Sequence, residues 1–279
     1  MSDALEQAIQ DRYDDLPAGE RKIADVLLEM RSELAAYSAT ELAARAGVSK
    51  ATTARLVRRL GYQDYQEMRQ EARAQWKNGS PLAELPDAQG QGGALGRHLE
   101  QDMTCLSLTL GTIPEGQTEM AIKLLGKAER LWVIGFRNSH ALALYARELL
   151  VQVKDDVRLL PVMGQTVAEE LSALSPKDVM LVVGFRRRPP ILAKILRHAK
   201  AMGVPVVLIG DPSLGELANW ANVCFRCLNR GASLFDSYVA GISLLNYLCS
   251  GVTLSLGETA QQKLRRNEQL HDEFGDFDL

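Results

Sequence analysis

Three consecutive arginines, Arg186 to Arg188, closely follow the apolar run VMLVV of residues 179–183. A run of this composition is typical of a strand that is buried on both faces of a parallel sheet. Ligands of open α/β sheets bind at the carboxyl ends of such strands. Guanidinium groups at that position can bind carboxylates or phosphates through paired hydrogen bonds. The stretch therefore predicts either an anion-binding loop or a solvated rim.

A second loop of related composition follows the apolar residues 131–134. The tripeptide GFR occurs in both loops, so Arg137 and Arg186 follow their strands at matching places and can converge on one anion. Ser139 is expected at the start of the next helix, where a hydroxyl and exposed N–H groups can hold an anion. Ser139 can instead be a helix cap alone. For the three consecutive arginines, the alternative is that at least two of them face solvent or a partner subunit.

The elements that position these loops follow from the pattern of the C-terminal part. Short apolar runs, each expected to be a strand, alternate with helical patterns at residues 131–134, 157–160, 179–183, 206–209 and 223–228. This alternation predicts right-handed βαβ units and an α/β doubly wound parallel five-stranded sheet covered by helices. A last, strongly apolar helix is expected over residues 233–256. Its apolar surface exceeds what one sheet face needs, which favours subunit packing.

The N-terminal part is helical in period, and residues 37–62 have the pattern of a helix-turn-helix. Thr40 is expected to cap a short helix, Gly47 to supply the positive φ of the turn, and Ser49 to cap the second helix. The first residues of such a second helix approach base edges in the major groove of DNA. The residues expected to contact DNA are Ser49, Lys50, Thr52, Thr53, Arg55, Arg58 and Arg59.

Charge supports this interpretation. Between Leu42 and Gln63 the chain has five basic residues and no Asp or Glu, although its net charge is −3. Such a local basic stripe is the electrostatic footprint of phosphate binding. The alternative is a solvated helix face in a helical bundle.

Composition and motifs set the organisation of the 279 residues. We expect an all-α helix-turn-helix domain over residues 1–76, a Gly-, Pro- and Gln-rich linker over 77–94, and a ligand-binding and dimerisation domain over 95–279. No signal peptide is recognisable, and no apolar run approaches the roughly 20 residues of a membrane span, which favours a cytoplasmic protein without membrane contact. Cys224 and Cys227 form a lone CxxC, which favours core residues on opposite faces of a strand over a metal site. Neither a metal nor a cofactor is expected.

Three segments resemble a known family: LPAGERKIADVLLEM (16–30), YSATELAARAGVSKATTARLVRRLGY (37–62) and QDYQEMR (63–69). They are similar to the helix-turn-helix domain of the RpiR/MurR transcriptional regulators, which join it to a C-terminal sugar isomerase (SIS) domain. In that family the second ligand loop is a Ser/Thr-rich phosphate cradle, which arginines replace here. The resemblance also implies that the helix expected from Ser233 lies near the ligand. The residues expected to bind the effector are Gly135, Arg137, Asn138, Ser139, Gly184, Arg186, Arg187 and Ser233.

The resemblance implies a DNA-binding transcriptional regulator, which we expect to be a repressor of a catabolic operon. Its expected partners are double-stranded operator DNA, an anionic small-molecule effector (a sugar phosphate or a carboxylate), and further copies of itself in a homodimer or homotetramer. One alternative is a SIS-fold sugar-phosphate isomerase or aldose–ketose processing enzyme. Such an enzyme needs a general base near the sugar carbons, but neither loop contains a Glu/His pair, so no enzyme is expected. Another alternative is a structural dimer module without a ligand.

Overall fold

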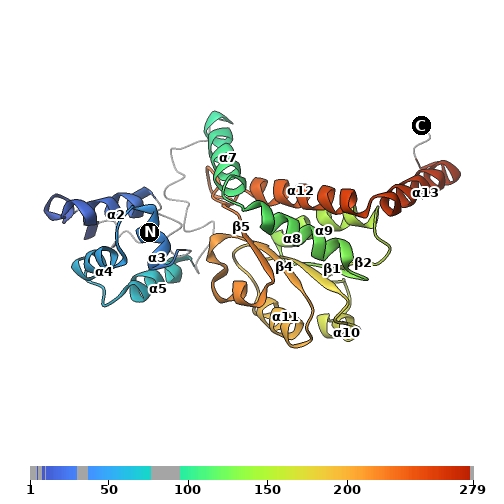
Figure 1. Ribbon diagram of the computed structural model, residues 1–279, viewed down its shortest axis with the longest axis horizontal. Coiled ribbons are helices and arrows are strands. Elements are labelled where there is room, and N and C mark those ends of the chain that lie inside the picture. The colour runs from blue at the N-terminus through green and yellow to red at the C-terminus, as the bar shows by residue number, and fades with distance from the viewer. Residues whose placement is uncertain (1–4, 6–7, 10, 30–36, 77–94, 277–279) are drawn as a thin grey trace. The chain divides into compact units, whose positions relative to one another are not determined.

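The structure is a computed structural model that describes residues 5, 8–9, 11–29, 37–76 and 95–276 (Figure 1). The chain divides into two compact units, Met1–Pro86 and Asp87–Leu279. The expected linker over 77–94 lies outside the described residues. The two units are described separately below.

Helices build the N-terminal unit around one small core. The core joins Ile23 of the first long helix to Leu42, Leu56 and Met68 of the following ones. The elements after the short 3-10 helix η1 (Tyr13–Asp15) are α2 (Ala18–Glu29), α3 (Ala39–Arg45), α4 (Lys50–Arg59) and α5 (Tyr65–Trp76).

The turn between α3 and α4 has the predicted helix-turn-helix geometry. Gly47 has a φ of 64°, which a residue without Cβ adopts freely. The Ser49 hydroxyl accepts a hydrogen bond from the Thr52 N–H and so caps α4. The cap of α3 differs from the prediction, because Ser38 and Glu41 form a reciprocal capping box and Thr40 lies inside the helix.

The C-terminal unit contains the doubly wound parallel sheet, with the strand order β2-β1-β3-β4-β5. The chain passes from β1 outward to β2 and then returns to the other side of β1 as β3, so the winding direction changes between β1 and β3. All neighbouring strands pair in parallel, and their bounds are β1 (Leu131–Gly135), β2 (Val157–Leu160), β3 (Val179–Val183), β4 (Val206–Gly210) and β5 (Val223–Arg226).

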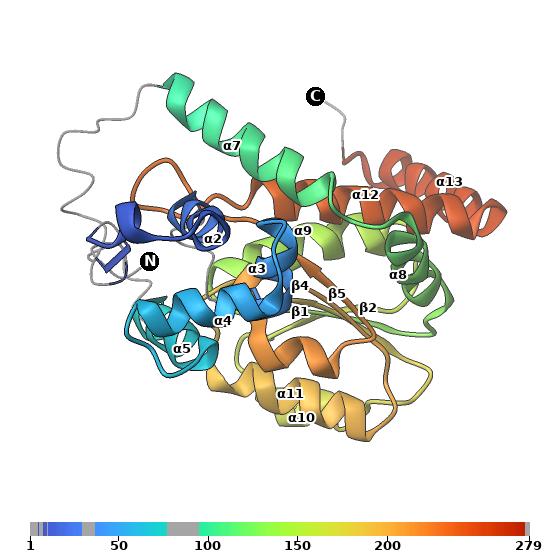
Figure 2. The ribbon, with the colours of Figure 1, turned by 60° about the vertical axis from the view of Figure 1, so that its left-hand side comes forward.

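Helices cover both faces of this sheet (Figures 1 and 2). Alternate strand residues point to opposite sides, so Val133 and Leu181 lie in one core while Trp132 and Met180 lie in the other. The first face packs against α7 (Leu95–Leu110), α8 (Glu115–Lys127), α9 (Asn138–Val151) and α12 (Val239–Leu256). The second packs against α10 (Val167–Leu171), α11 (Pro190–Ala201) and the 3-10 helix η3 (Pro212–Trp220), while α13 (Glu258–Phe274) follows α12.

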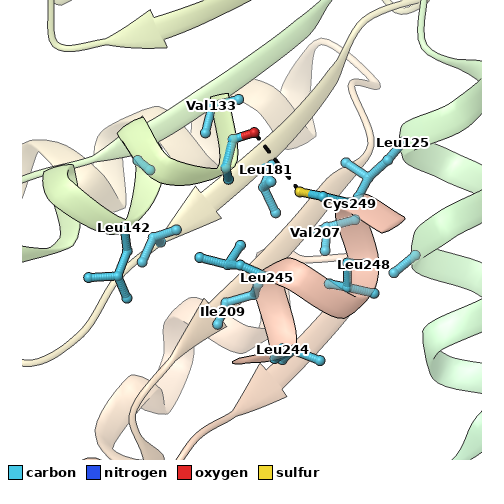
Figure 3. Packing of buried hydrophobic residues seen from close by; sticks show 14 of the residues in the cluster. Leu125, Val133, Leu142, Leu181, Val207, Ile209, Leu244, Leu245, Leu248 and Cys249 are labelled. Carbon is cyan, nitrogen blue, oxygen red and sulfur yellow. Dashed lines mark hydrogen bonds between the residues drawn. The ribbon is translucent and has the colours of Figure 1, made fainter. Parts of the chain in front are cut away.

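Helix α12 belongs to the core of this unit. Leu244, Leu245 and Leu248 pack with Val207 and Ile209 of β4, as Figure 3 shows. Its 18 residues have a mean hydropathy of 1.5, which is long and apolar enough for a membrane span by length and composition alone. The expectation that no stretch approaches that length was therefore wrong. Burial of one helix face against the sheet accounts for Leu244, Leu245 and Leu248, while other apolar residues of α12 are exposed.

The start of α12 also differs from the prediction. The helix begins at Val239 and not at Ser233. The preceding residues form a loop, in which the Ser237 N–H donates to the Asn229 carbonyl and Asp236 binds Arg186. Contacts within the loop and to the loop after β3 thus replace the first turns of the expected helix.

The two cysteines of the CxxC motif lie on opposite faces of the sheet, as predicted. Cys224 packs against the core between the sheet and α11, and Cys227 lies in the core between the sheet and α12. Burial raises the pKa of both thiols, that of Cys227 to about 12. These thiols are therefore protonated core side chains at neutral pH.

Candidate effector and DNA-binding sites

The carboxyl ends of β1 and β3 lie side by side at the point where the winding direction changes. Gly135 at the end of β1 is in register with Val183 at the end of β3. The loops that follow these strands, residues 136–137 and 184–189, are therefore neighbours. In doubly wound sheets the crevice at this switch point is the usual ligand site.

Ser139 connects the two loops. It lies in the first turn of α9, is 4% exposed, and its hydroxyl accepts a hydrogen bond of 3.1 Å from the Phe185 N–H. Arg137, not Ser139, occupies the N-cap position of α9, so the simple capping role considered for Ser139 is wrong. Ser139 instead holds the second loop against the first.

The two predicted site glycines have packing roles. A Cβ on Gly135 would lie 2.2 Å from the Ser139 carbonyl oxygen and 2.8 Å from the Cβ of Ala143. A Cβ on Gly184 would lie 3.0 Å from Leu192 Cδ2. Gly135 thus permits the close approach of α9 to β1 that brings Ser139 to the second loop.

Two arginines of these loops have an unusual backbone conformation. Among the described residues, Arg137 (φ 57°) and Arg187 (φ 62°) are the non-glycine residues with positive φ. Both side chains are exposed at the switch point. The φ and ψ of Arg137, 57° and −129°, nearly equal those of Gly215 and Gly257. The chain therefore uses arginine where it elsewhere uses glycine, and strain of this kind clusters at functional sites.

This strain gives a testable expectation for stability. Strain of this kind costs about 1–3 kcal/mol, and a glycine avoids it at an entropic cost of roughly 0.5–1 kcal/mol. We expect Arg137→Gly to raise the free energy of unfolding by about 1 kcal/mol relative to Arg137→Ala, which loses the guanidinium but keeps the Cβ. Urea unfolding of both variants measures the difference. Equal stability of the two variants would mean that Arg137 is unstrained.

Arg186 is paired within the chain. Its guanidinium forms a two-pronged ion pair with Asp236, with Nε–Oδ2 at 2.8 Å and Nη2–Oδ1 at 2.5 Å. The two side chains are only 18% and 14% exposed. The predicted clamp of Arg137 and Arg186 on an external anion is thus modified, because a carboxylate of the protein already occupies Arg186.

Arg188 is bound more deeply still. It donates to the Asp211 carboxylate at 2.6 Å, to the Gly184 carbonyl at 2.9 Å, and to the hydroxyl and carbonyl of Ser213. Asp211 is fully buried. Arg188 is therefore a structural residue that fastens the second loop to the end of β4.

Aromatic and amide contacts complete the surroundings of the second loop. The Phe185 ring packs edge-on against Tyr238 at 5.1 Å and lies against Gly241 of α12. The Asn138 amide donates to the Tyr238 hydroxyl at 3.3 Å. Burial raises the pKa of the Tyr238 phenol, which keeps it neutral. The start of α12 thus packs directly onto both loops.

Ser233 is exposed in the loop before α12, so its predicted place at a helix start is wrong.

An open depression elsewhere in this unit is lined by Arg158, Glu169 and Glu170 beside β2 and α10. Its two carboxylates favour cations over anions, so it is not the predicted effector site.

The N-terminal unit presents a row of polar residues along α4. The Ser49 and Thr52 hydroxyls lie 2.9 Å apart, and Arg55 donates to the Thr52 hydroxyl at 3.2 Å. Lys50 and Arg58 are exposed on the same helix. Lys50, Arg55 and Arg58 are therefore exposed basic residues on a capped helix. A recognition helix contacts DNA with side chains of this kind.

Two of the predicted DNA contacts have other roles. Thr53 is fully buried, and its hydroxyl has no hydrogen-bond partner within the described residues. It therefore cannot contact DNA in this structure. Arg59 forms a 2.9 Å ion pair with the buried Glu20 and so ties α4 to α2, although 45% of its side chain stays exposed. The ion pair of Arg59 was not predictable from the basic stripe, because Glu20 is distant in sequence. The burial of Thr53 has a local signal, since Thr53 shares a helix face with Leu56 and Val57.

Each of the two units contains a segment that matches a known protein family. Residues 3–78 match the helix-turn-helix domain of the rpiR family, and residues 124–250 match the SIS domain. The HTH-type transcriptional regulator HexR of Pseudomonas aeruginosa is 26% identical over 95% of this chain and 94% of its own length. An uncharacterized HTH-type transcriptional regulator of Thermotoga maritima is 24% identical over 78% of this chain and 79% of that protein.

Two solved structures have a similar fold. The sugar isomerase domain of an RpiR transcription factor from Sphaerobacter thermophilus has 25% identity and a TM-score of 0.58, over 62% of this chain and 97% of that one. The Vibrio vulnificus NanR protein, complexed with ManNAc-6P, has 17% identity and a TM-score of 0.60, over 97% of this chain and 98% of that one.

A DNA-reading helix-turn-helix followed by a SIS domain defines a class of transcriptional regulators in which one domain binds DNA and the other a small molecule. The chain belongs to this class as a member of the RpiR family. The two relatives from Pseudomonas aeruginosa and Thermotoga maritima are both named as HTH-type transcriptional regulators.

Proposed function

We propose that the protein is a cytoplasmic repressor of a catabolic operon, controlled by a sugar phosphate that binds at the switch point of its SIS domain. The observation that carries this proposal is the pair of strained, exposed arginines, Arg137 and Arg187, at the ends of β1 and β3. Backbone strain needs a compensating role, and exposed guanidinium groups at a switch point suit a phosphate. The ManNAc-6P complex of NanR supports a phosphorylated sugar as the effector class.

The regulator interpretation is preferred to an isomerase. A DNA-reading unit serves no purpose in an isomerase. In the second loop, Arg186 and Arg188 are bound to Asp236 and Asp211, and a guanidinium stays protonated, so it cannot act as the general base that isomerisation needs. We expect the protein to bind its own promoter DNA. A sugar phosphate should release the protein from that DNA without being converted to another compound. Turnover of a sugar phosphate would contradict the proposal.

DNA binding is proposed for the exposed face of α4, formed by Ser49, Lys50, Thr52, Arg55 and Arg58. We expect Arg55→Ala and Arg58→Ala each to weaken binding to every DNA sequence and to reduce the salt dependence by about one unit of slope. Fluorescence anisotropy at several salt concentrations measures both effects, with Arg197→Ala on α11 as a charge-matched control. Wild-type affinity and slope in both variants would show that α4 does not bind phosphates.

We also propose that the SIS unit forms a dimer, because exposed apolar side chains lie on two helices that cover the same face of the sheet. The most exposed of them are Leu95, Leu99 and Met103 on α7, and Tyr247 and Leu254 on α12. Patches of this kind are rare on monomers. We expect the fragment from residue 95 onward to sediment at twice its monomer mass at micromolar concentration. A monomer in that experiment would remove the dimer from the proposal.

A further inference from the structure

The loop from Leu228 to Tyr238, here called the 228–238 segment, connects the sheet to α12 and touches α7 at its first end. The Leu228 N–H donates to the Thr109 hydroxyl at 2.9 Å. The Cys105 thiol donates to the Arg230 carbonyl at 3.4 Å. Thr109 and Cys105 are the buried residues of α7. This end of the segment therefore holds the buried face of α7, which also packs against α12.

The other end of the segment touches the candidate effector site. Asp236 forms the two-pronged ion pair with Arg186, and Tyr238 packs on Phe185 and accepts from Asn138. Within the segment, the Ser237 N–H donates to the Asn229 carbonyl at 2.9 Å. These contacts close the segment on itself, so one short loop links Asp236 to the residues that contact α7.

The ion pair is mostly shielded from water, with side chains 18% and 14% exposed. Separating it takes from each charge its oppositely charged neighbour in a site with little water, which is unfavourable unless another anion takes the place of Asp236 on Arg186. A phosphate monoester can do so, because it has about −1.5 to −2 charges and three acceptor oxygens against the single charge of a carboxylate.

We propose that Asp236 is an internal competitor for the effector: it occupies Arg186 in the effector-free regulator, and the phosphate group of the effector displaces it. The displaced 228–238 segment then shifts α7, the first described helix after the residues that join the two units in sequence. This inference rests on the proposed sugar-phosphate site and specifies how that site is regulated. It also means that effector affinity is lowered by the fraction of molecules in which Asp236 occupies Arg186.

The test uses the full chain and two probes, inorganic phosphate and glucose 6-phosphate, titrated by isothermal calorimetry. Asp236→Asn removes the competing charge and keeps the side-chain shape. If the ion pair is formed about nine times in ten, this variant binds the probes about tenfold more tightly than wild type. Its affinity for promoter DNA, without probe, is expected to equal that of wild type saturated with probe. Asp155→Asn, which breaks the ion pair with Lys263, is the matched control and is expected to match wild type.

A second variant tests transmission without altering the site. Thr109→Val removes the hydroxyl that accepts from Leu228, and it is expected to bind the probes as wild type does while its DNA affinity no longer responds to them. Thr104→Val on the same helix is the control, because within the described part of the chain the Thr104 hydroxyl bonds only to the Glu100 carbonyl of its own helix.

The outcomes separate this inference from the function on which it rests. Equal probe affinity in wild type and Asp236→Asn would overturn the competitor role of Asp236 and leave the effector site intact. A full DNA response in Thr109→Val would overturn the transmission through α7. Binding of neither probe to either protein would overturn the proposed sugar-phosphate site, and the competitor role with it.

Discussion

Arg188→Met is expected to lower the free energy of unfolding of the SIS unit by about 3–5 kcal/mol, because it leaves the buried Asp211 carboxylate without its cation. Arg188 also donates to Gly184 and Ser213, so its loss frees the second loop from the end of β4. Urea unfolding at neutral pH measures the loss.

The matched variant for this prediction removes both charges. In Arg188→Met with Asp211→Asn no unpaired charge stays buried, and the Asn side chain can still accept from the Ser213 N–H that Asp211 now bonds. The double variant should therefore recover most of the lost stability. A single variant within 1 kcal/mol of wild type (about the value of an ordinary exposed pair) would mean that solvent reaches Asp211.

The second large effect concerns the effector. A charge-assisted hydrogen bond to a guanidinium contributes roughly 1.5–3 kcal/mol, which corresponds to a factor of about ten to over a hundred in affinity. We expect Arg186→Ala and Arg137→Ala each to weaken sugar-phosphate binding by such a factor. Promoter DNA is still bound by the separate N-terminal unit, at a level that no longer changes with sugar phosphate.

Calorimetric titration with a panel of hexose phosphates, followed by DNA binding with each compound, measures both parts of this prediction. Arg158→Ala is a suitable control, because Arg158 lies on β2 and pairs with Asp156, away from the switch point. If both site variants respond to the effector as wild type does, neither arginine contacts the effector, and Arg186 serves only its ion pair with Asp236.

Local patterns in the sequence predicted the parts of the structure that depend on neighbours in the chain. The Gly47 turn and the Ser49 cap are set by residues within one turn of helix, and both are present as predicted. The three central strands were recognisable because burial on both faces requires continuous apolar runs, whereas the edge strands β2 and β5 are partly exposed and each contains an arginine. The strand pattern predicted the fold class and the two loops at the strand ends.

Contacts between distant residues were not predictable in this way. Arg186 and Asp236 are 50 residues apart, and Arg188 and Asp211 are 23 apart. A run of arginines has the same sequence whether it binds a ligand or a carboxylate of the protein itself. The burial of Thr53 could have been predicted, because Thr53 lies three and four residues before Leu56 and Val57 and therefore shares their apolar helix face.

The hydrogen bond from the Phe185 N–H to the Ser139 hydroxyl has a consequence for measurement. This amide is buried between two loops and outside the strand ladder, so its exchange with deuterium requires that the loops separate. Exchange at the strand amides, by contrast, requires that the sheet itself opens. The Phe185 amide is therefore a natural probe, built into the backbone, of how often the switch point opens while the rest of the domain stays folded.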